Sequence, residues 1–348
     1  MTQAHLESPA PDVSTSQAEQ LASSWFGVRG TARTAASERD LNFLLDAPDQ
    51  PAVLKISNPL VEESLISLQV AALDRLAGGP VPVPRVIPTV DGKPWKPLEL
   101  ADGRRAWVWM ISRLPGVDAE KIQPKPRSLL IGTAVAAAGL AQRLASFDHP
   151  AARRELIWDL DQAHRLRPLL GELEDRRAAD RVRRVLDQHD ARVAPRLPDL
   201  RRQVIHADLN PANVLADPQS HQLTGIIDFG DLVHTALIND LAIALAYPLL
   251  ETDSAEPAAI MTRAYHQALG LTPLEQELLP LRVMTRWATT VTISLWRATR
   301  HPDNRDYIML HAQPALEALA RMEKPSVFAE LCEACRPTKR RGQSKGTE

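Results

Sequence analysis

The sequence contains few features that would point to an unusual class of protein. Only two of its 348 residues are cysteine, and both belong to a single C-x-x-C, at Cys332 and Cys335. A structural zinc site needs four ligands, so two thiols alone do not predict one. We interpret both as reduced thiols and expect a cytoplasmic protein.

Strong charge and long apolar runs are also missing. The net charge of −2 gives no strong field, and the basic cluster Lys339, Arg340, Arg341 and Lys345 lies in a polar tail. The longest apolar stretch, at 129–141, has 13 residues, too short to span a bilayer. The first 20 residues lack the apolar core of a signal peptide. We therefore expect neither a nucleic-acid nor a membrane partner.

What is present is an ordinary globular composition, with 44% hydrophobic and 24% charged residues. The length suggests two lobes. Apolar periodicity and turn residues predict an amphipathic helix that ends near Trp25 and a helix over 61–77. They also predict four strands, over 41–45, 52–57, 85–90 and 106–114. Residues 20–112 are therefore expected to form a strand-rich lobe that follows a flexible arm over 1–19.

From residue 113 onward the pattern is mainly helical. Helices are predicted over 128–145, 160–170, 171–192, 238–249, 255–269, 273–298 and 306–322, with strands only at 204–206 and 222–227. We expect a helical C-terminal lobe over 113–335 and a disordered basic tail over 336–348. A small β-rich lobe joined to a large helical lobe is an α+β fold, with a cleft between the lobes as the expected ligand site.

One stretch combines polar residues with short apolar runs in a specific spacing. His206 and Asp208 are followed by Asn213, and after fourteen intervening residues Asp228 begins the sequence D-F-G. This matches the H-x-D-x-x-x-x-N and D-F-G of a kinase catalytic loop. An isolated aspartate at a strand end is usually a turn or a helix cap. Here three positions agree in type and spacing, so the stretch predicts phosphoryl transfer.

The chemistry assigns a role to each of these residues. Transfer to an alcohol needs a group that accepts the hydroxyl proton, for which Asp208 is the candidate base. Asn213 and Asp228 offer oxygen ligands to Mg²⁺, which takes few protein carboxylates and keeps waters and phosphate oxygens. His206 is flanked by apolar residues, and we interpret it as a buried histidine that braces the loop.

The chain resembles the aminoglycoside phosphotransferase and choline kinase-like family of small-molecule kinases. Within that family it is most similar to the hydroxylysine kinase group, including kinase domains fused to class III aminotransferases. Besides the catalytic stretch, the resemblance rests on SERDLNFLL (37–45), LKISNP (54–59), FDHPA and WDL (147–160) and DLAIALAY (240–247). It covers residues 20–325 and implies a protein-kinase-like bilobal fold with ATP as the phosphate donor.

The resemblance also implies the nucleotide-binding residues. The ATP-binding lysine of the family falls on Lys55, and the turn that covers the phosphates falls at Ser37. The end of the strand predicted over 106–114, which contains Ile111, Ser112 and Leu114, resembles the hinge whose backbone groups bind adenine.

Two positions leave alternatives open. A helix glutamate usually pairs with the lysine, but Gln69 stands at its expected place, so either Glu62 or Glu63 reaches the lysine or a neutral amide holds it. Asp240 matches a family aspartate that braces the catalytic loop, although capping of the following helix explains it equally well.

The substrate-binding residues are predicted from charge. Asp231 could bind a substrate ammonium group or simply begin the next turn. Arg286, Thr290 and Ser294 recur every four residues and form a polar stripe on an otherwise apolar helix. The stripe either faces solvent, or Arg286 binds a substrate carboxylate through two hydrogen bonds.

The predicted function is an ATP- and Mg-dependent phosphotransferase acting on a hydroxyl of a small amine or amino acid, such as hydroxylysine, homoserine or an amino alcohol. An antibiotic phosphotransferase of the aminoglycoside type is an alternative. A protein kinase is a second alternative, against which the sequence after Gly230 leaves no room for an activation segment and contains no A-P-E. The absent helix glutamate suggests a third, a non-catalytic nucleotide-binding regulator.

Overall fold

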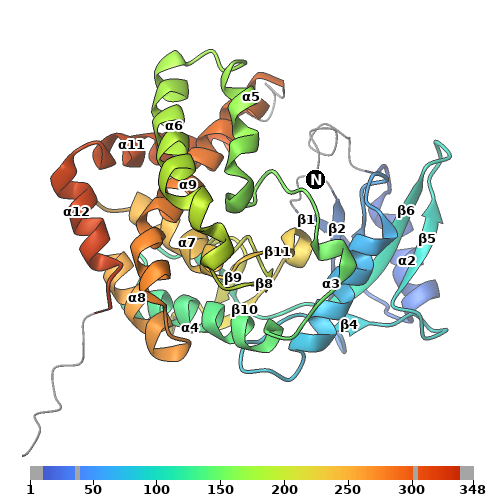
Figure 1. Ribbon diagram of the computed structural model, residues 1–348. Helices are drawn as coiled ribbons and strands as arrows, with labels where there is room; N and C mark the ends of the chain where they lie inside the picture. The colour runs from blue at the N-terminus through green and yellow to red at the C-terminus, as the bar shows by residue number, and fades with distance from the viewer. Residues whose placement is uncertain (1–10, 36–39, 301–304, 338–348) are drawn as a thin grey trace, which may run out of the picture. The chain divides into compact units, whose positions relative to one another are not determined.

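The computed structural model describes residues 11–35, 40–300 and 305–337, and these form two compact units (Figure 1). The first unit contains the chain up to Ile122 together with Gly139–Gln162 and Arg202–Leu237. The second contains Gln123–Ala138, Ala163–Arg201 and the chain from Ile238 onward. The catalytic stretch belongs to the first unit.

An antiparallel sheet forms the N-terminal part of the first unit. Its strands run in the order β1 (Thr31–Ala35), β2 (Leu41–Asp46), β3 (Ala52–Ile56), β6 (Arg105–Ser112) and β4 (Val86–Ile87), and β5 (Trp95–Glu99) also pairs with β6. Strands were predicted at β2, β3, β4 and β6. The sequences of β1 and β5 gave no strand signal because β1 is polar and β5 contains a proline.

Helix α2 (Thr15–Phe26) packs against the sheet and shares its core. It begins inside the range predicted to be a flexible arm, because Ser14 and Gln17 form a capping box that the apolar pattern alone did not reveal. Ala18, Ala22 and Phe26 follow at intervals of four residues and face the same apolar core as the sheet. The other helix of this part is α3 (Glu63–Leu76).

Two small sheets surround the catalytic stretch. One has the order β10 (Leu223–Ile226), β9 (Val214–Ala216) and β7 (Val117–Asp118); the other pairs β11 (Val233–Ala236) with β8 (Arg202–Ile205). Only β8 and β10 were predicted, because strands of two to four residues are too short to show periodicity. Pairing of β9 with β7 joins the catalytic stretch to the N-terminal part of the unit.

Helices make up most of the second unit. They are α5 (Arg167–Leu170), α6 (Arg176–Gln188), α7 (Ile238–Ala246), α8 (Glu256–Ala268), α9 (Pro273–Arg300), α10 (Arg305–Met309), α11 (Ala312–Met322) and α12 (Pro325–Ala334), while α4 (Arg127–Leu144) contributes to both units. Short 3₁₀ turns lie at Ala119–Lys121, Pro150–Ala152, Leu160–Leu166, Ala194–Asp199, Phe229–Asp231 and Pro248–Leu250, and a π turn lies at His189–Val193.

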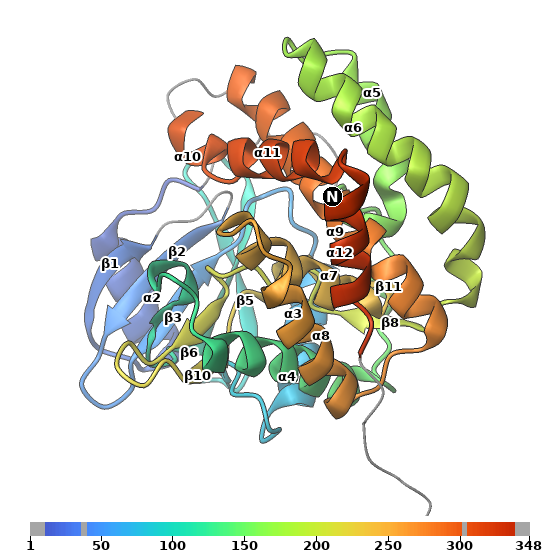
Figure 2. The ribbon, with the colours of Figure 1, turned by 90° about the vertical axis from the view of Figure 1, so that its left-hand side faces the viewer.

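Helix α9 is the centre of the second unit. Helices α6, α7, α10 and α11 pack against it (Figure 2), and every residue from Leu278 to Ser294 is buried. A helix buried around its whole circumference belongs to a core. Among the described residues, none of the helices combines the length and apolar character needed to cross a bilayer.

Two glycines allow the segment after β6 to lie close to β9 and β10. A Cβ atom on Gly116 would lie 2.4 Å from the Thr224 Oγ1 atom and 2.8 Å from the carbonyl oxygen of Ala216. A Cβ atom on Gly225 would lie 2.4 Å from the Leu114 Cδ1 atom. The Thr224 hydroxyl donates to the carbonyl of Pro115 at 2.7 Å. Only glycine permits this separation, which places Leu114 against the strand that leads to Asp228.

We expect Gly116→Ala to lower the free energy of unfolding by more than its backbone conformation alone explains. Gly116 has a φ of 113° and Gly103 a φ of 80°, so alanine strains the backbone at both, by about 1–2 kcal/mol. A Cβ on Gly103 meets no atom within 4 Å, whereas crowding at Gly116 should add about 1–3 kcal/mol. Urea denaturation of the two variants tests this; equal losses would show that the close approach contributes nothing.

Candidate active site

His206 lies at the centre of the predicted catalytic loop and is fully buried. Its Nδ1 atom accepts the backbone N–H of Asp208 at 3.2 Å, which assigns the ring proton to Nε2. Nε2 therefore donates to the carbonyl of Ile227 at 3.0 Å. The ring also meets Phe229 edge to face, with centroids 4.7 Å apart. His206 thus joins the loop after β8 to the segment after β10.

Two asparagines orient the carboxylate of Asp208. Its Oδ2 atom accepts hydrogen bonds from the side-chain amides of Asn210, at 2.9 Å, and Asn213, at 2.8 Å. Asn210 in turn accepts the backbone N–H of Ala212 at 2.8 Å, which fixes its amide. Asp208 remains partly exposed. Neutral donors therefore hold the carboxylate in place without cancelling its charge.

Strand pairing brings Asn213 and Asp228 to neighbouring positions. Asn213 directly precedes β9, and its carbonyl accepts the N–H of Ile227 at 2.9 Å, one residue before Asp228. The Asn213 amide nitrogen donates to Asp208, which turns the amide oxygen away from that carboxylate. Asp228 has a left-handed conformation, with φ 62° and ψ 78°, and its side chain is 55% exposed. Its carboxylate accepts the N–H of Gly230 at 3.3 Å.

These two side chains fit a magnesium ion shared with a nucleotide. Mg²⁺ prefers oxygen ligands and is usually held by one or two carboxylates, with waters and phosphates completing its octahedron. Asn213 and Asp228 offer one amide oxygen and one exposed carboxylate. No group of three or more histidine, cysteine, aspartate or glutamate residues gathers anywhere in the part of the chain that the structure describes. The donor set thus suits an ion that also binds phosphate rather than a site made by protein alone.

Lys55 lies on β3 beside this pair. Its Nζ atom is 3.9 Å from Oδ1 of Asp228 and 5.2 Å from the ring centroid of Trp109, opposite it on β6. The Lys55 side chain is only 9% exposed, and a buried ammonium is costly unless an anion faces it. Asp228 supplies one negative charge, and the site can accommodate more.

The partner of Lys55 was left open between two glutamates and a neutral amide. Glu63 accepts the indole N–H of Trp95 at 2.9 Å, and Glu62 accepts the hydroxyl of Ser64 at 3.2 Å. The amide of Gln69 donates within its own helix, to the carbonyl of Leu65 at 3.3 Å. In the described structure the ionic contact of Lys55 is therefore with Asp228, at a long distance.

The predicted adenine-binding segment ends the strand β6. Ile111 is buried between β3 and β4. The N–H of Ser112 donates to the carbonyl of Arg85 at 2.8 Å, and that of Arg113 to the carbonyl of Pro51 at 3.0 Å. Sheet contacts thus use these two amides, and the chain leaves the sheet at Leu114. Ser37, predicted to cover the phosphates, lies outside the described residues.

The remaining predicted residues divide between the two units. Asp231 lies in the first unit, at the end of the 3₁₀ turn that follows Asp228, and is 8% exposed. Asp240 lies in the second, in the first turn of α7, where it is 1% exposed.

The polar stripe of α9 also lies in the second unit, and the interpretation that it faces solvent is wrong. Arg286, Thr290 and Ser294 are all buried, because α9 is the central helix of its unit. The guanidinium of Arg286 donates to the hydroxyl of Tyr247 at 2.7 Å and lies 5.7 Å from the centroid of that ring.

Several residues that support the site were not predicted from the sequence. Arg154 donates to the carbonyls of Gly230 and Leu232. Asp159 accepts the hydroxyl of Thr235 at 2.7 Å, and burial, together with the charge of Asp161, raises the pKa of Asp159. The available signal was the pair of motifs FDHPA and WDL, which lie on either side of Arg154 and served only to mark the resemblance.

The C-x-x-C thiols are not bonded to each other. Burial raises the pKa of Cys335 to about 12 and also raises that of Cys332. Since the thiolate is the reactive form, both cysteines are poor nucleophiles at neutral pH.

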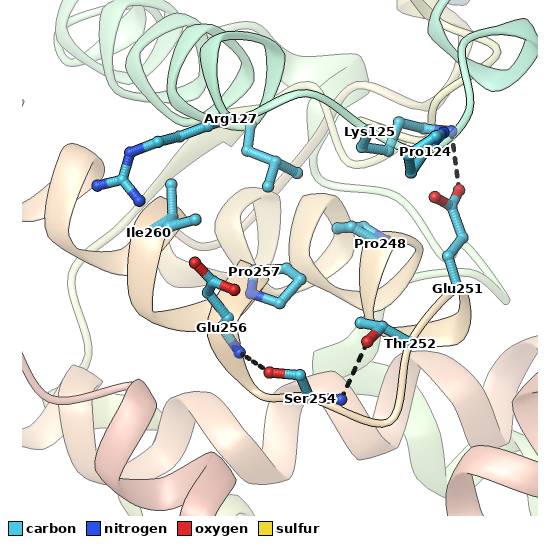
Figure 3. A pocket seen from close by; sticks show the side chains of 11 residues that line it. Pro124, Lys125, Arg127, Pro248, Glu251, Thr252, Ser254, Glu256, Pro257 and Ile260 are labelled. Atoms are coloured by element: carbon cyan, nitrogen blue, oxygen red, sulfur yellow. Dashed lines mark hydrogen bonds and ion pairs between the residues drawn. The ribbon is translucent and has the colours of Figure 1, made fainter.

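The second unit contains a pocket whose lining residues differ from the predicted site residues (Figure 3). An ion pair between Lys125 and Glu251, 2.8 Å long, closes one side, and Arg127 and Glu256 lie on the other. Prolines and aliphatic side chains supply much of the remaining wall. None of the predicted site residues belongs to this wall.

We expect His206→Leu to destabilise the protein by about 2–4 kcal/mol, because two buried backbone groups lose their partners. These groups are the N–H of Asp208 and the carbonyl of Ile227. The free energy of unfolding measured in urea tests this. His164→Leu is the matched control, because His164 is exposed and should change stability by less than about 0.5 kcal/mol. A His206 variant as stable as the control would exclude the bracing role.

Known proteins similar to this chain provide an independent comparison. A family model described as "Phosphotransferase enzyme family" matches residues 31–281. Hydroxylysine kinase of Danio rerio is 25% identical over 328 residues, which cover 90% of this chain and 92% of that protein.

Solved structures show the same fold at lower sequence identity. A microcompartment-associated aminopropanol kinase superposes with a TM-score of 0.68 and 19% identity, covering 91% of this chain and 100% of that one. Amicoumacin kinase in complex with AMP-PNP, Ca²⁺ and Ami gives a TM-score of 0.66 and 15% identity, covering 88% of this chain and 94% of that one. These likenesses confirm the predicted α+β, protein-kinase-like fold class. The chain belongs to the phosphotransferase enzyme family, which confirms the resemblance drawn from its motifs and the prediction of a small-molecule kinase.

Proposed function

We propose that the protein transfers the γ-phosphate of ATP to a hydroxyl group of a small amine or amino acid. The observation that carries the proposal is one cluster of the first unit. It combines the oriented carboxylate of Asp208, the adjacent oxygens of Asn213 and Asp228, and the buried ammonium of Lys55. Phosphoryl transfer needs a base for the acceptor hydroxyl, oxygen ligands for the ion and a cation for the phosphates, and these groups supply all three.

The nucleotide is held at its two ends. The ammonium of Lys55 binds the phosphates, whose negative charge adds to that of Asp228 beside it. The backbone of Ser112 and Leu114 binds the adenine at the end of β6. The resemblance to the family assigns contact with the phosphates to Ser37 as well.

Asn213 and Asp228 would hold Mg²⁺ through their side-chain oxygens. When bound, the ion neutralises charge on the phosphate groups during transfer. Asn213 can serve both purposes, because its nitrogen orients Asp208 while its oxygen remains available to a cation.

Asp208 accepts the proton of the attacking hydroxyl. Its two amide donors keep the carboxylate in one orientation and leave it acceptor-only, as a base requires. The hydroxyl oxygen then bonds to the γ-phosphorus as the bond from that phosphorus to the ADP oxygen breaks.

For the acceptor we favour a hydroxylated amino acid or amino alcohol. Similar proteins whose names state a substrate of this kind include the hydroxylysine kinase and the aminopropanol kinase. We propose that the carboxylate of Asp231 binds the substrate ammonium group. The binding of a substrate carboxylate by Arg286 stays a prediction from the sequence.

A protein substrate is less well supported. Strand β11 begins at Val233 and α7 at Ile238, so an activation segment has no place after Gly230. A non-catalytic regulator would not need an oriented Asp208, which the site retains.

A substrate panel tests the proposed reaction. With Mg·ATP, we expect one phosphorylated product, identified by mass, from hydroxylysine, homoserine, aminopropanol, ethanolamine or choline. Aminoglycosides in the same panel test the antibiotic alternative, and a protein library tests the protein-kinase alternative. No product from any small molecule would exclude the proposal.

Asp208→Asn tests the role of the base. We expect kcat to fall by about 10²–10⁴-fold, because asparagine cannot accept the proton, while ATP binding measured by calorimetry stays unchanged. Asp187→Asn, at an exposed aspartate of α6, is the control and should leave both quantities unchanged. Turnover that is unaffected by Asp208→Asn would contradict the mechanism.

A further inference from the structure

We propose that Arg154 is a positioning residue that holds Asp228 in its ion-binding conformation. The inference rests on the proposed function, because it concerns the same candidate magnesium site. The Nη2 atom of Arg154 donates to the carbonyl of Gly230 at 2.7 Å, and its Nε atom donates to the carbonyl of Leu232 at 3.1 Å. One guanidinium thus holds two carbonyls of the segment that directly follows Asp228.

The backbone of this segment is anchored at both of its ends. Before Asp228, the N–H of Ile227 donates to the carbonyl of Asn213. After Leu232, the strand β11 pairs with β8. Between these anchors the backbone makes a single 3₁₀ turn, Phe229–Asp231, whose last carbonyls have no partner within the turn. Arg154 supplies these partners, and its positive charge also suits the negative end of a helical turn.

Asp228 itself needs such support. A left-handed conformation is unfavourable for a residue with a Cβ and persists only where the surroundings impose it. The side chain is exposed, so packing around the carboxylate does not impose it. Fixing the carbonyl two residues later restricts the rotations of the turn that carries Asp228, and with them the direction of its carboxylate.

Arg154 is itself held in place. The amide of Gln162 donates to its carbonyl at 3.2 Å and to Asp159 at 3.0 Å. Just before it, Nδ1 of His149 accepts the N–H of Ala151, so its Nε2 donates to the hydroxyl of Ser67 on α3 at 3.3 Å. Helix α3 also lies against the turns at 150–152 and 229–231. The guanidinium therefore extends from a segment that is tied to the same helix as the turn it holds.

A titration with Mg²⁺ tests this inference. It measures the Mg²⁺ concentration at which half of the magnesium-dependent ATP binding is reached, which is the midpoint. We expect Arg154→Gln to raise this midpoint by about tenfold or more, the effect typical of residues that orient a metal ligand. ATP binding in EDTA should stay unchanged, because Lys55 and the adenine-binding backbone are intact. In the metal-free protein, hydrogen exchange of residues 228–232 should become faster, which is a readout independent of catalysis.

Arg153→Gln is the matched control, because Arg153 is the neighbouring arginine and pairs at the surface with Asp148. We expect its midpoint and its exchange to equal those of the wild type. If Arg154→Gln does not fold, Arg154→Lys decides, because lysine keeps the charge but cannot span two carbonyls as a planar guanidinium does. Its expected shift is about tenfold, the lower end of such effects.

The outcomes separate the two proposals. A wild-type protein whose ATP binding becomes tighter with Mg²⁺, together with a folded Arg154 variant of unchanged midpoint, would overturn the inference and leave the proposed function intact. Loss of ATP binding in EDTA as well would show general damage rather than positioning, and would also overturn it. A wild type without magnesium-dependent binding would overturn the proposed function and this inference with it.

Discussion

Both backbone groups of Ile227 are bonded to the catalytic loop, and this double contact fixes the geometry of the site. Its N–H donates to the carbonyl of Asn213, and its carbonyl accepts from the imidazole of His206. Buried backbone groups must be paired, so neither bond can be released without a cost. Asp228, the next residue, is thereby placed beside the loop that carries Asp208. The two halves of the motif meet because the residue just before Asp228 bonds to the catalytic loop through both of its backbone groups.

The same region holds two residues in strained conformations. Ala207 and Asp228 both have positive φ angles of about 60°, which side chains with a Cβ disfavour. Ala207 lies next to His206, whose ring makes two hydrogen bonds to backbone groups, and Asp228 lies next to Ile227, whose two backbone groups are both bonded. The strain is therefore offset by hydrogen bonds on either side, and it turns the carboxylates of Asp208 and Asp228 out of the strands that precede them. Strained backbone at a reactive site is a common arrangement in enzymes.

The same region contains Lys55, a buried cation. Lys55 is buried on a strand with one exposed carboxylate 3.9 Å away, an arrangement that is weak by itself and improves when phosphate is added. The side-chain amides of Asn210 and Asn213 donate to Asp208, and these donors carry no charge.

The sequence by itself determined the parts whose signal is local. The spacing of His206, Asp208, Asn213 and Asp228 identified the chemistry, because a catalytic loop constrains residue types at fixed short intervals. Composition excluded a membrane span over the longest apolar run, and periodicity located most of the long helices. The capping box at Ser14 was equally local but was overlooked, because it lies outside the apolar pattern.

Tertiary structure decided everything that depends on contacts between distant residues. Strands β7, β9 and β11 are too short for periodicity and exist through their pairing. The polar stripe that contains Arg286 was ambiguous because the same residue pattern fits a solvent-facing stripe and a buried one. Only the helices that pack around α9 reveal that the stripe is buried. Arg154 stands 76 residues before the carbonyl of Gly230 that it holds. A side chain bonded to a distant backbone carbonyl leaves no pattern of residue types, so only the fold could show it.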